Sequence, residues 1–162
     1  MYMKEIIEKL IKLNKTISTM ESCTGGSLAG FITNIEGSST VFKFGAVTYS
    51  NEFKIKMGVS EEVIDKYSVY SENTAKEMSK SISNFTNSDY GIGITGKLNR
   101  ADINNLSGED DIVYISIYDK EKDTYYNDKI KVIYETREEN KQYVIDKVIE
   151  LLGGILWEYI IH

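Results

Sequence analysis

The chain has 162 residues, a length typical of one domain, so we expect a single domain over residues 1–162. Hydrophobic residues make up 41% of the chain, which suffices for a buried core and is too high for a disordered protein. The net charge of −6 argues against nucleic acid as a partner, because a surface that follows a phosphate backbone needs an excess of Lys and Arg.

The first half of the chain alternates short helical and strand patterns. Apolar residues at helical spacing predict the helices, and β-rich or alternating runs predict the strands. Ser60 and Ser71 are suited to cap the helices that follow them. In chain order we expect a helix over 2–14, a strand over 16–20, a turn over 22–26, a helix over 27–35, a strand over 42–49, and helices over 51–57, 61–66 and 72–85.

The second half predicts a strand over 89–95, a polar exposed loop over 97–111, strands over 112–118 and 123–134, and a helix over 135–161. The short polar stretch between the last two strands indicates an antiparallel hairpin. Gly153-Gly154 predicts a kink or break in the last helix. Helices and strands mix throughout, so the predicted class is a three-layer α/β/α domain with a mixed sheet that includes this hairpin.

Cysteine and histidine occur once each, as Cys23 and His162. A single cysteine excludes an internal disulfide and indicates a reducing compartment, so we expect a cytoplasmic protein. The N-terminus is amphipathic rather than a signal peptide, and the apolar run 151–161 is too short for a bilayer, so we expect no membrane partner. A Ser-His-Asp or Cys-His centre would depend on the last residue and is set aside, and the count excludes a zinc site of His and Cys.

Residues 20–26, Met-Glu-Ser-Cys-Thr-Gly-Gly, form a glycine-rich turn between a predicted strand and a predicted helix. Such a turn directs Ser22, a candidate nucleophile, and several backbone N–H groups toward one point, where a phosphate or an oxyanion would be stabilised. Taken alone, Ser22 is explained more simply as a helix N-cap. Tyr49 and Lys54 lie where a predicted strand ends and a short helix follows, and a lysine or tyrosine can replace histidine as the base for a serine.

In combination, these segments resemble the CinA C-terminal domain family, whose enzymatic members are nicotinamide-nucleotide amidases. The resemblance covers nearly the whole chain. It rests on Glu-Ser-Cys-Thr-Gly-Gly at 21–26, Gly-Ser-Ser-x-x-Phe at 37–42, Gly-Ala-Val-Thr-Tyr-Ser-Asn-Glu-Phe-Lys at 45–54, Met-Gly-Val-Ser at 57–60, Tyr-Ser-Val-Tyr-Ser-Glu-Asn-Thr-Ala at 67–75, Thr95-Gly96, and Arg137 with its following helix. We expect a stand-alone version of this domain.

The resemblance implies that Ser22 is the nucleophile and that Tyr49 and Lys54 activate it. It also implies hydrolysis of the carboxamide of nicotinamide mononucleotide to nicotinic acid mononucleotide and ammonia, a reaction that needs no metal or redox cofactor by this route. The expected partner is therefore a small pyridine nucleotide. We expect its binding residues to be Thr24, Gly25, Gly26, Thr95, Gly96 and Arg137. Arg137 opens the last helix, where a positive charge opposes the helix dipole and so suggests an anionic ligand.

The segment after Thr95-Gly96 departs from the family pattern. Family members usually continue with Ile-Ala-Gly-Pro and further glycines, whereas this chain continues with Lys97, Leu98 and, later, Arg100. We expect the loop over 97–111 to lie beside Ser22, where Lys97 and Arg100 either contact a phosphate or close the pocket. Two alternatives therefore stay open: a catalytically inactive nucleotide-binding or regulatory homologue, and an amidase for a different small amide.

Two aromatic residues near the C-terminus, Trp157 and Tyr159, bear on oligomeric state. They are as consistent with a homo-oligomeric contact as with ordinary core packing. A metal site at the acidic run 109–111 is less favoured than a solvated loop, because three adjacent carboxylates cannot all face one ion.

Overall fold

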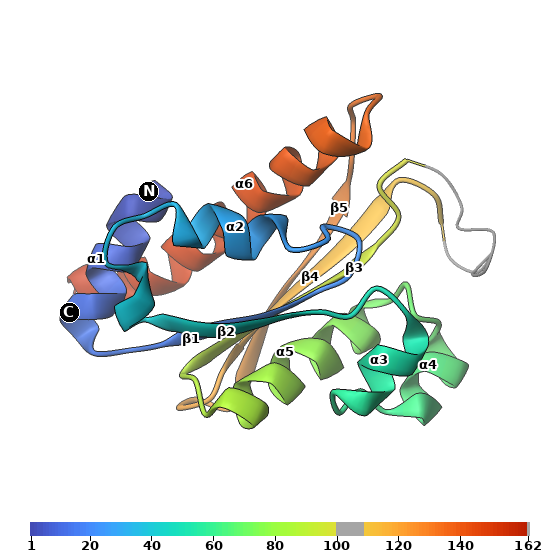
Figure 1. The fold of residues 1–162 in the computed structure, drawn as a ribbon, viewed down its shortest axis with the longest axis horizontal. Coiled ribbons are helices and arrows are strands. Elements are labelled where there is room, and N and C mark those ends of the chain that lie inside the picture. The colour runs from blue at the N-terminus through green and yellow to red at the C-terminus, as the bar shows by residue number, and fades with distance from the viewer. Residues whose placement is uncertain (100–108, 162) are drawn as a thin grey trace.

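A computed structural model describes residues 1–99 and 109–161. Five strands form one sheet in the order β2-β1-β3-β4-β5, with helices on both of its faces (Figure 1). The elements are α1 (Met3–Leu13), β1 (Ile17–Glu21), α2 (Ser27–Thr33), η1 (Ser38–Thr40), β2 (Phe42–Val47), α3 (Asn51–Lys56), α4 (Glu61–Tyr67), α5 (Glu72–Thr86), β3 (Tyr90–Gly96), β4 (Ile112–Asp119), β5 (Thr124–Lys131) and α6 (Arg137–Ile161).

The sheet is mixed, as predicted. β1 pairs in parallel with β2 and β3, whereas β4 is antiparallel to β3 and forms a hairpin with β5. Helices α1, α2 and α6 cover one face, and α3, α4 and α5 lie on the other (Figure 1). The predicted class, a three-layer α/β/α domain with a mixed sheet and an antiparallel hairpin, is therefore confirmed.

The parallel strands bring three chain segments to one edge of the sheet. Glu21, the last residue of β1, is in register with Val47 of β2 and with Ile94 of β3. The segments that follow these strands therefore begin side by side, which is where ligand-binding loops gather in α/β sheets. Ser22 and Tyr49 both lie in these segments.

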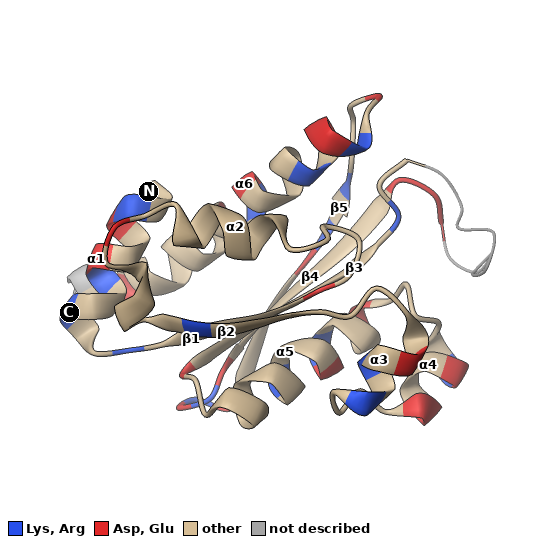
Figure 2. Cartoon of the chain, in the orientation of Figure 1, with Lys and Arg blue, Asp and Glu red and all other residues tan. Residues whose placement is uncertain are grey.

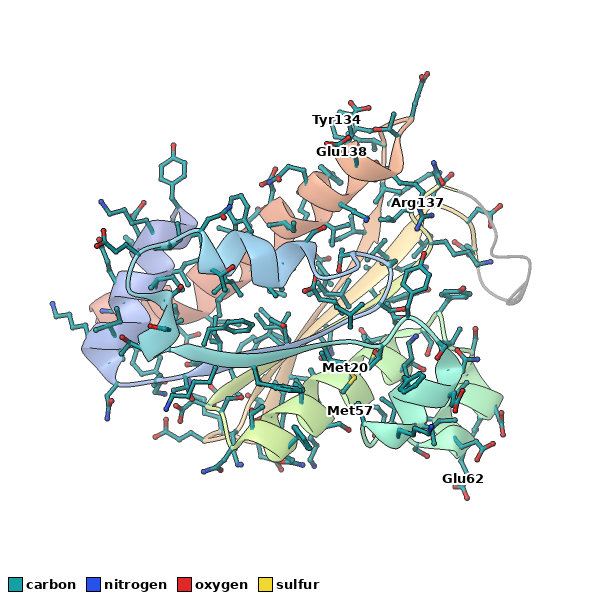
Figure 3. The ribbon with its side chains drawn as sticks, viewed as in Figure 1. Met20, Met57, Glu62, Tyr134, Arg137 and Glu138 are labelled. Carbon is teal, nitrogen blue, oxygen red and sulfur yellow. The ribbon has the colours of Figure 1, made fainter. Side chains whose placement is uncertain are left out.

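Each face of the sheet has its own buried core. The larger cluster lies under α1, α2 and α6 and includes Ile92, Ile94 and Leu28. The smaller cluster joins Met20 of β1 to Met78 and Ile82 of α5, and Figure 3 shows Met20 on the α5 side of the sheet. β1 is buried along its whole length, because both neighbouring strands and both helical layers cover it.

Glycines in β3 allow α5 to lie close to the sheet. A Cβ at Gly93 would overlap the carbonyl oxygen of Ala75 and would lie 2.7 Å from the backbone nitrogen of Ser79. Both of these atoms belong to the α5 backbone, which cannot move aside as a flexible side chain could. Helix and strand therefore pack at a distance that only glycine permits.

Replacing Gly93 by alanine is expected to lower the free energy of unfolding by about 3 kcal/mol, because the added methyl group forces α5 away from β3. Gly154→Ala is the matched control. It lies in α6 with no atom within 4 Å of an added Cβ, so it should raise the free energy of unfolding by about 0.5–1 kcal/mol through helix propensity. Urea denaturation of both variants measures these changes, and a Gly93→Ala variant as stable as the wild type would contradict the close packing.

Two expectations about the second half of the chain differ from the structure. α6 runs from Arg137 to Ile161 as one helix, so the predicted break is absent, and a kink at Gly153-Gly154 stays a prediction. Its packing outweighs the poor helix propensity of the two glycines, and a Cβ at Gly153 would lie 3.3 Å from the Met1 side chain. The loop after β3 does not begin exposed either, because Lys97 and Leu98 are both buried.

The two C-terminal aromatic residues, Tyr159 and Trp157, differ in their burial. Tyr159 is partly buried against the larger core, and its hydroxyl accepts a hydrogen bond of 2.8 Å from Lys15 Nζ. Trp157 is 53% exposed, so a role in contacts between copies remains a prediction for that residue alone. Over residues 1–99 and 109–161, no helix has the length and apolar character needed to cross a bilayer.

Candidate functional site

Ser22 leaves the carboxyl end of β1 at the start of a tight turn. Its backbone N–H donates to Ile94 O of β3 at 3.0 Å, and its carbonyl oxygen accepts from Gly25 N at 3.0 Å. Gly26 has a φ of +96°, in the region that side chains rarely adopt, and α2 begins directly after it. The chain therefore reverses within four residues and holds Ser22 above the sheet edge.

Glu21, whose role the sequence did not reveal, organises this turn. Its buried carboxylate accepts hydrogen bonds from Thr24 Oγ1 at 2.7 Å, from Leu28 N at 2.8 Å and from Ala29 N at 3.0 Å. α2 has no charged residue of its own, and Gly26 gives it no side-chain cap (Figure 2). Glu21 thus supplies from the preceding strand the negative charge that the helix start lacks. The sequence did contain a signal for this role: a glutamate lies shortly before a predicted helix that has no capping side chain.

Lys54 is the side chain at hydrogen-bond distance from Ser22. α3, which is capped by the Ser50 hydroxyl, positions it. The lysine is only 2% exposed, and its Nζ lies 2.9 Å from Ser22 Oγ and 2.8 Å from Thr48 O. The Thr48 carbonyl fixes the amine in place, because Thr48 itself is tied to the end of β1 by its N–H to Glu21 O. Serine and lysine therefore meet in a buried, oriented pair.

Tyr49 and Arg137 form a second pair at the same edge. Arg137 Nη2 donates to the Tyr49 hydroxyl at 3.1 Å, joining the segment after β2 to the first turn of α6. Tyr49 is 63% exposed, unlike Lys54. Figure 3 shows Arg137 at the end of α6 that lies near the strand ends. The predicted residues thus gather at one edge, with Lys54 next to Ser22 and Tyr49 next to Arg137.

The remaining predicted binding residues have defined places in the fold. The hydroxyl groups of Thr24 and Thr95 are buried and donate to Glu21 and to Val69 O, respectively. A Cβ at Gly96 would lie 2.5 Å from Val113 Cα, so β4 requires glycine there. Gly25 uses its N–H within the turn. Substrate binding by these residues remains a prediction.

The start of the divergent segment is anchored beside this edge. Lys97, 3% exposed, pairs with Asp110 at 3.6 Å and lies over the Tyr70 ring. Asn140 Nδ2 of α6 donates to Leu98 O at 2.7 Å. The burial of Lys97 has a structural cause, namely these contacts. Arg100, for which a phosphate contact was considered, lies outside the described residues.

Cys23, next to Ser22, is poorly suited to act as a nucleophile. Burial raises the pKa of its thiol to about 12, against the opposing charges of Arg137 and Lys54. The thiolate is the reactive form of cysteine, and almost none is present near neutral pH when the pKa is so high. No group of three His, Cys, Asp or Glu side chains in the described part of the chain is arranged to hold a metal ion.

Alkylation should therefore distinguish folded from unfolded protein. At pH 8, Cys23 in the folded chain is expected to react with iodoacetamide roughly 10³-fold more slowly than in urea, where its pKa returns to about 8.5. Mass spectrometry of quenched samples measures both rates. Rapid modification of the folded protein at pH 8 would show that the thiol is ionised and would reopen the assignment of the nucleophile.

Comparison with known proteins agrees with this architecture. The family model of the CinA C-terminal domain matches residues 1–156. A relative in Thermoanaerobacter pseudethanolicus (strain ATCC 33223 / 39E), whose name describes a competence-damage inducible protein, is 45% identical over 96 residues, which cover 58% of this chain and 23% of the relative. The chain thus spans about a quarter of the length of such curated relatives.

Solved structures of the CinA superfamily share the fold. A protein from Klebsiella pneumoniae 700603 superposes with a TM-score of 0.85 at 22% identity, covering 98% of this chain and 99% of its own. One from Escherichia coli gives a TM-score of 0.86 at 23% identity, covering 94% and 87% of the two chains. At this identity the likeness establishes the fold alone, whereas the family model covers nearly every residue. The chain therefore belongs to the CinA C-terminal domain family.

Proposed function

We propose that this protein is a serine amidohydrolase that cleaves the carboxamide of nicotinamide mononucleotide. The observation that carries the proposal is the distance of 2.9 Å between Ser22 Oγ and the buried amine of Lys54. A nucleophile and a base within hydrogen-bond distance of each other are the arrangement that covalent catalysis requires. The substrate is inferred from the likeness of the sequence motifs to those of nicotinamide-nucleotide amidases.

The first step forms an acyl-enzyme. Ser22 Oγ attacks the carboxamide carbon and its proton passes to the amine of Lys54, which acts as the general base. The C–N bond then breaks, and the protonated Lys54 returns the proton to the departing nitrogen, which leaves as ammonia. The Thr48 carbonyl keeps the amine aimed at Ser22 throughout.

Backbone groups of the turn are suited to stabilise the oxyanion that forms during this attack. Gly25 N–H is used by Ser22 O, whereas the N–H groups of Thr24 and Gly26 donate to no backbone oxygen of residues 1–99 or 109–161. Oriented donors of this kind stabilise developing negative charge without having to reorganise. We assign the oxyanion to these two groups.

The second step releases the acid. A water molecule gives its proton to Lys54 and attacks the acyl carbon, after which Ser22 leaves as a hydroxyl by recovering a proton from Lys54. The products are nicotinic acid mononucleotide and ammonia, so atoms and charge balance without a redox partner or metal. Arg137, fixed by Tyr49, supplies positive charge at the site for an anionic substrate.

Ammonia release from a panel of pyridine nucleotides tests this proposal. We expect turnover of nicotinamide mononucleotide and slower turnover of nicotinamide riboside and of nicotinamide. Turnover of another small amide in place of these would show a different amidase. Binding of the mononucleotide with no ammonia release from any amide would indicate an inactive nucleotide-binding homologue.

A further inference from the structure

Lys141 lies beside the turn that carries Ser22. A Cβ atom at Gly25 would lie 3.6 Å from Lys141 Nζ, an ordinary van der Waals distance, so this amine lies directly against the turn at its glycine. Lys141 is four residues beyond Arg137, and residues at this spacing share one face of a helix. Two cationic side chains of α6 therefore flank the same turn.

Neither cation is neutralised by a carboxylate in the described part of the chain. Arg137 is bonded to the uncharged Tyr49 hydroxyl, and Lys141 forms no ion pair, although Glu138 is on the preceding turn. Glu139 is engaged by Thr136 Oγ1 at 2.7 Å. The chain as a whole carries a net charge of −6, so two cations that have no carboxylate partner beside a nucleophile are suited to an anionic ligand.

The surroundings of Lys141 indicate where that anion would lie. Lys141 also lines an open groove of about 400 Å³, together with Ser27 and Gln142, but Glu138 and Glu139 line the same groove. Two carboxylates disfavour a phosphate there. At the turn itself, the Glu21 carboxylate is engaged by hydrogen bonds from Thr24 and from the start of α2. The positive charges of Arg137 and Lys54 reach Cys23 strongly enough to oppose the rise in its pKa.

We propose that Lys141 makes the site specific for a phosphorylated substrate by binding the phosphate of the mononucleotide beside Gly25. This inference rests on the proposed function, because it names the group that distinguishes nucleotide from nucleoside at that site. Because Nζ lies this close to Gly25, a phosphate that rests against the turn there is within reach of the amine. Lys141 is a specificity residue, since its amine is directed at the turn rather than at the Ser22–Lys54 pair.

The role of Lys141 in specificity can be tested by measuring ligand binding in a variant that cannot turn over the substrate. Calorimetry in a Ser22→Ala background compares nicotinamide mononucleotide with nicotinamide riboside. Lys141→Met should weaken binding of the mononucleotide about tenfold and leave the riboside within twofold. Lys147→Met on the same helix, whose lysine pairs with Glu150, is the matched control and should change neither. Lys141→Arg, which keeps the charge, should retain the discrimination.

The outcomes separate this inference from the proposed function. Equal weakening of both ligands by Lys141→Met, or no weakening of either, overturns the inference, whatever the wild type hydrolyses. If Lys141→Met weakens binding of the mononucleotide alone, the inference is supported. If the wild type nevertheless releases no ammonia, the proposed amidase activity is overturned. Absence of mononucleotide binding to the Ser22→Ala protein overturns both.

Discussion

Replacing Ser22 by alanine is expected to lower kcat for nicotinamide mononucleotide by at least about 10⁴-fold. Without the hydroxyl no acyl-enzyme forms, and only binding and oriented backbone donors remain to promote attack by water. The substitution removes one hydrogen bond to Lys54, which keeps its bond to the Thr48 carbonyl. The free energy of unfolding should therefore change by less than about 1 kcal/mol. Ammonia release and urea denaturation measure the two effects.

Cys23→Ala is the matched comparison, one residue along the same turn. Its thiol is buried and has a pKa raised to about 12 by that burial, so its removal should leave kcat within a few-fold of the wild type. The loss of a small buried side chain lowers stability modestly, and assays should be run well below the melting temperature. A folded, inactive Cys23→Ala protein together with an active Ser22→Ala protein would reverse the assignment of the nucleophile.

Local signals in the sequence predicted the elements well where helix ends carry their own caps. α5 begins after Ser71, whose hydroxyl accepts from Thr74 N, and it ends at Asn87 in the left-handed conformation. These groups act within one turn, so a pattern of residues reveals them. The break predicted in α6 is absent, and a Cβ at Gly153 would lie 3.3 Å from the side chain of Met1, a neighbour far away in the sequence that no local pattern reveals.

Long-range contacts account for what the sequence did not reveal about the site. Ser22, Lys54, Tyr49 and Arg137 were identified from the sequence, but it left open whether Lys54 or Tyr49 is the immediate base. Which base is adjacent to Ser22 depends on how α3 packs against the end of β2. Glu21 was missed because its partners appear only when the turn closes. In the same way, Lys141 has an ordinary place in the pattern of α6 and becomes notable only beside Gly25.

The burial of Lys97 shows the same limit at the entrance to the divergent segment. A lysine after a strand, followed by polar residues, predicts exposure. In the structure, Asp110 and the ring of Tyr70 make its burial tolerable, and these partners come from both sides of the segment. Charge pairing across a loop leaves no periodic signal in the sequence.

Lys54→Met should also abolish most of the activity, lowering kcat about 10³-fold or more through loss of the general base. Methionine keeps the length and apolar character of the buried stem, so the protein should fold. Lys54→Arg should have a kcat no higher than that of Lys54→Met, because a guanidinium stays protonated and cannot accept the serine proton. Ammonia release at saturating nicotinamide mononucleotide gives kcat, and the melting temperature of each variant reports folding.

Tyr49→Phe decides between the two candidate bases. The Tyr49 hydroxyl is bonded to Arg137, whereas Lys54 Nζ is the group 2.9 Å from Ser22 Oγ. We therefore expect Tyr49→Phe to raise KM several-fold by releasing Arg137 and to change kcat less than tenfold. A larger loss of kcat in Tyr49→Phe than in Lys54→Met would make the tyrosine the base. It would also mean that Lys54 serves only to position Ser22.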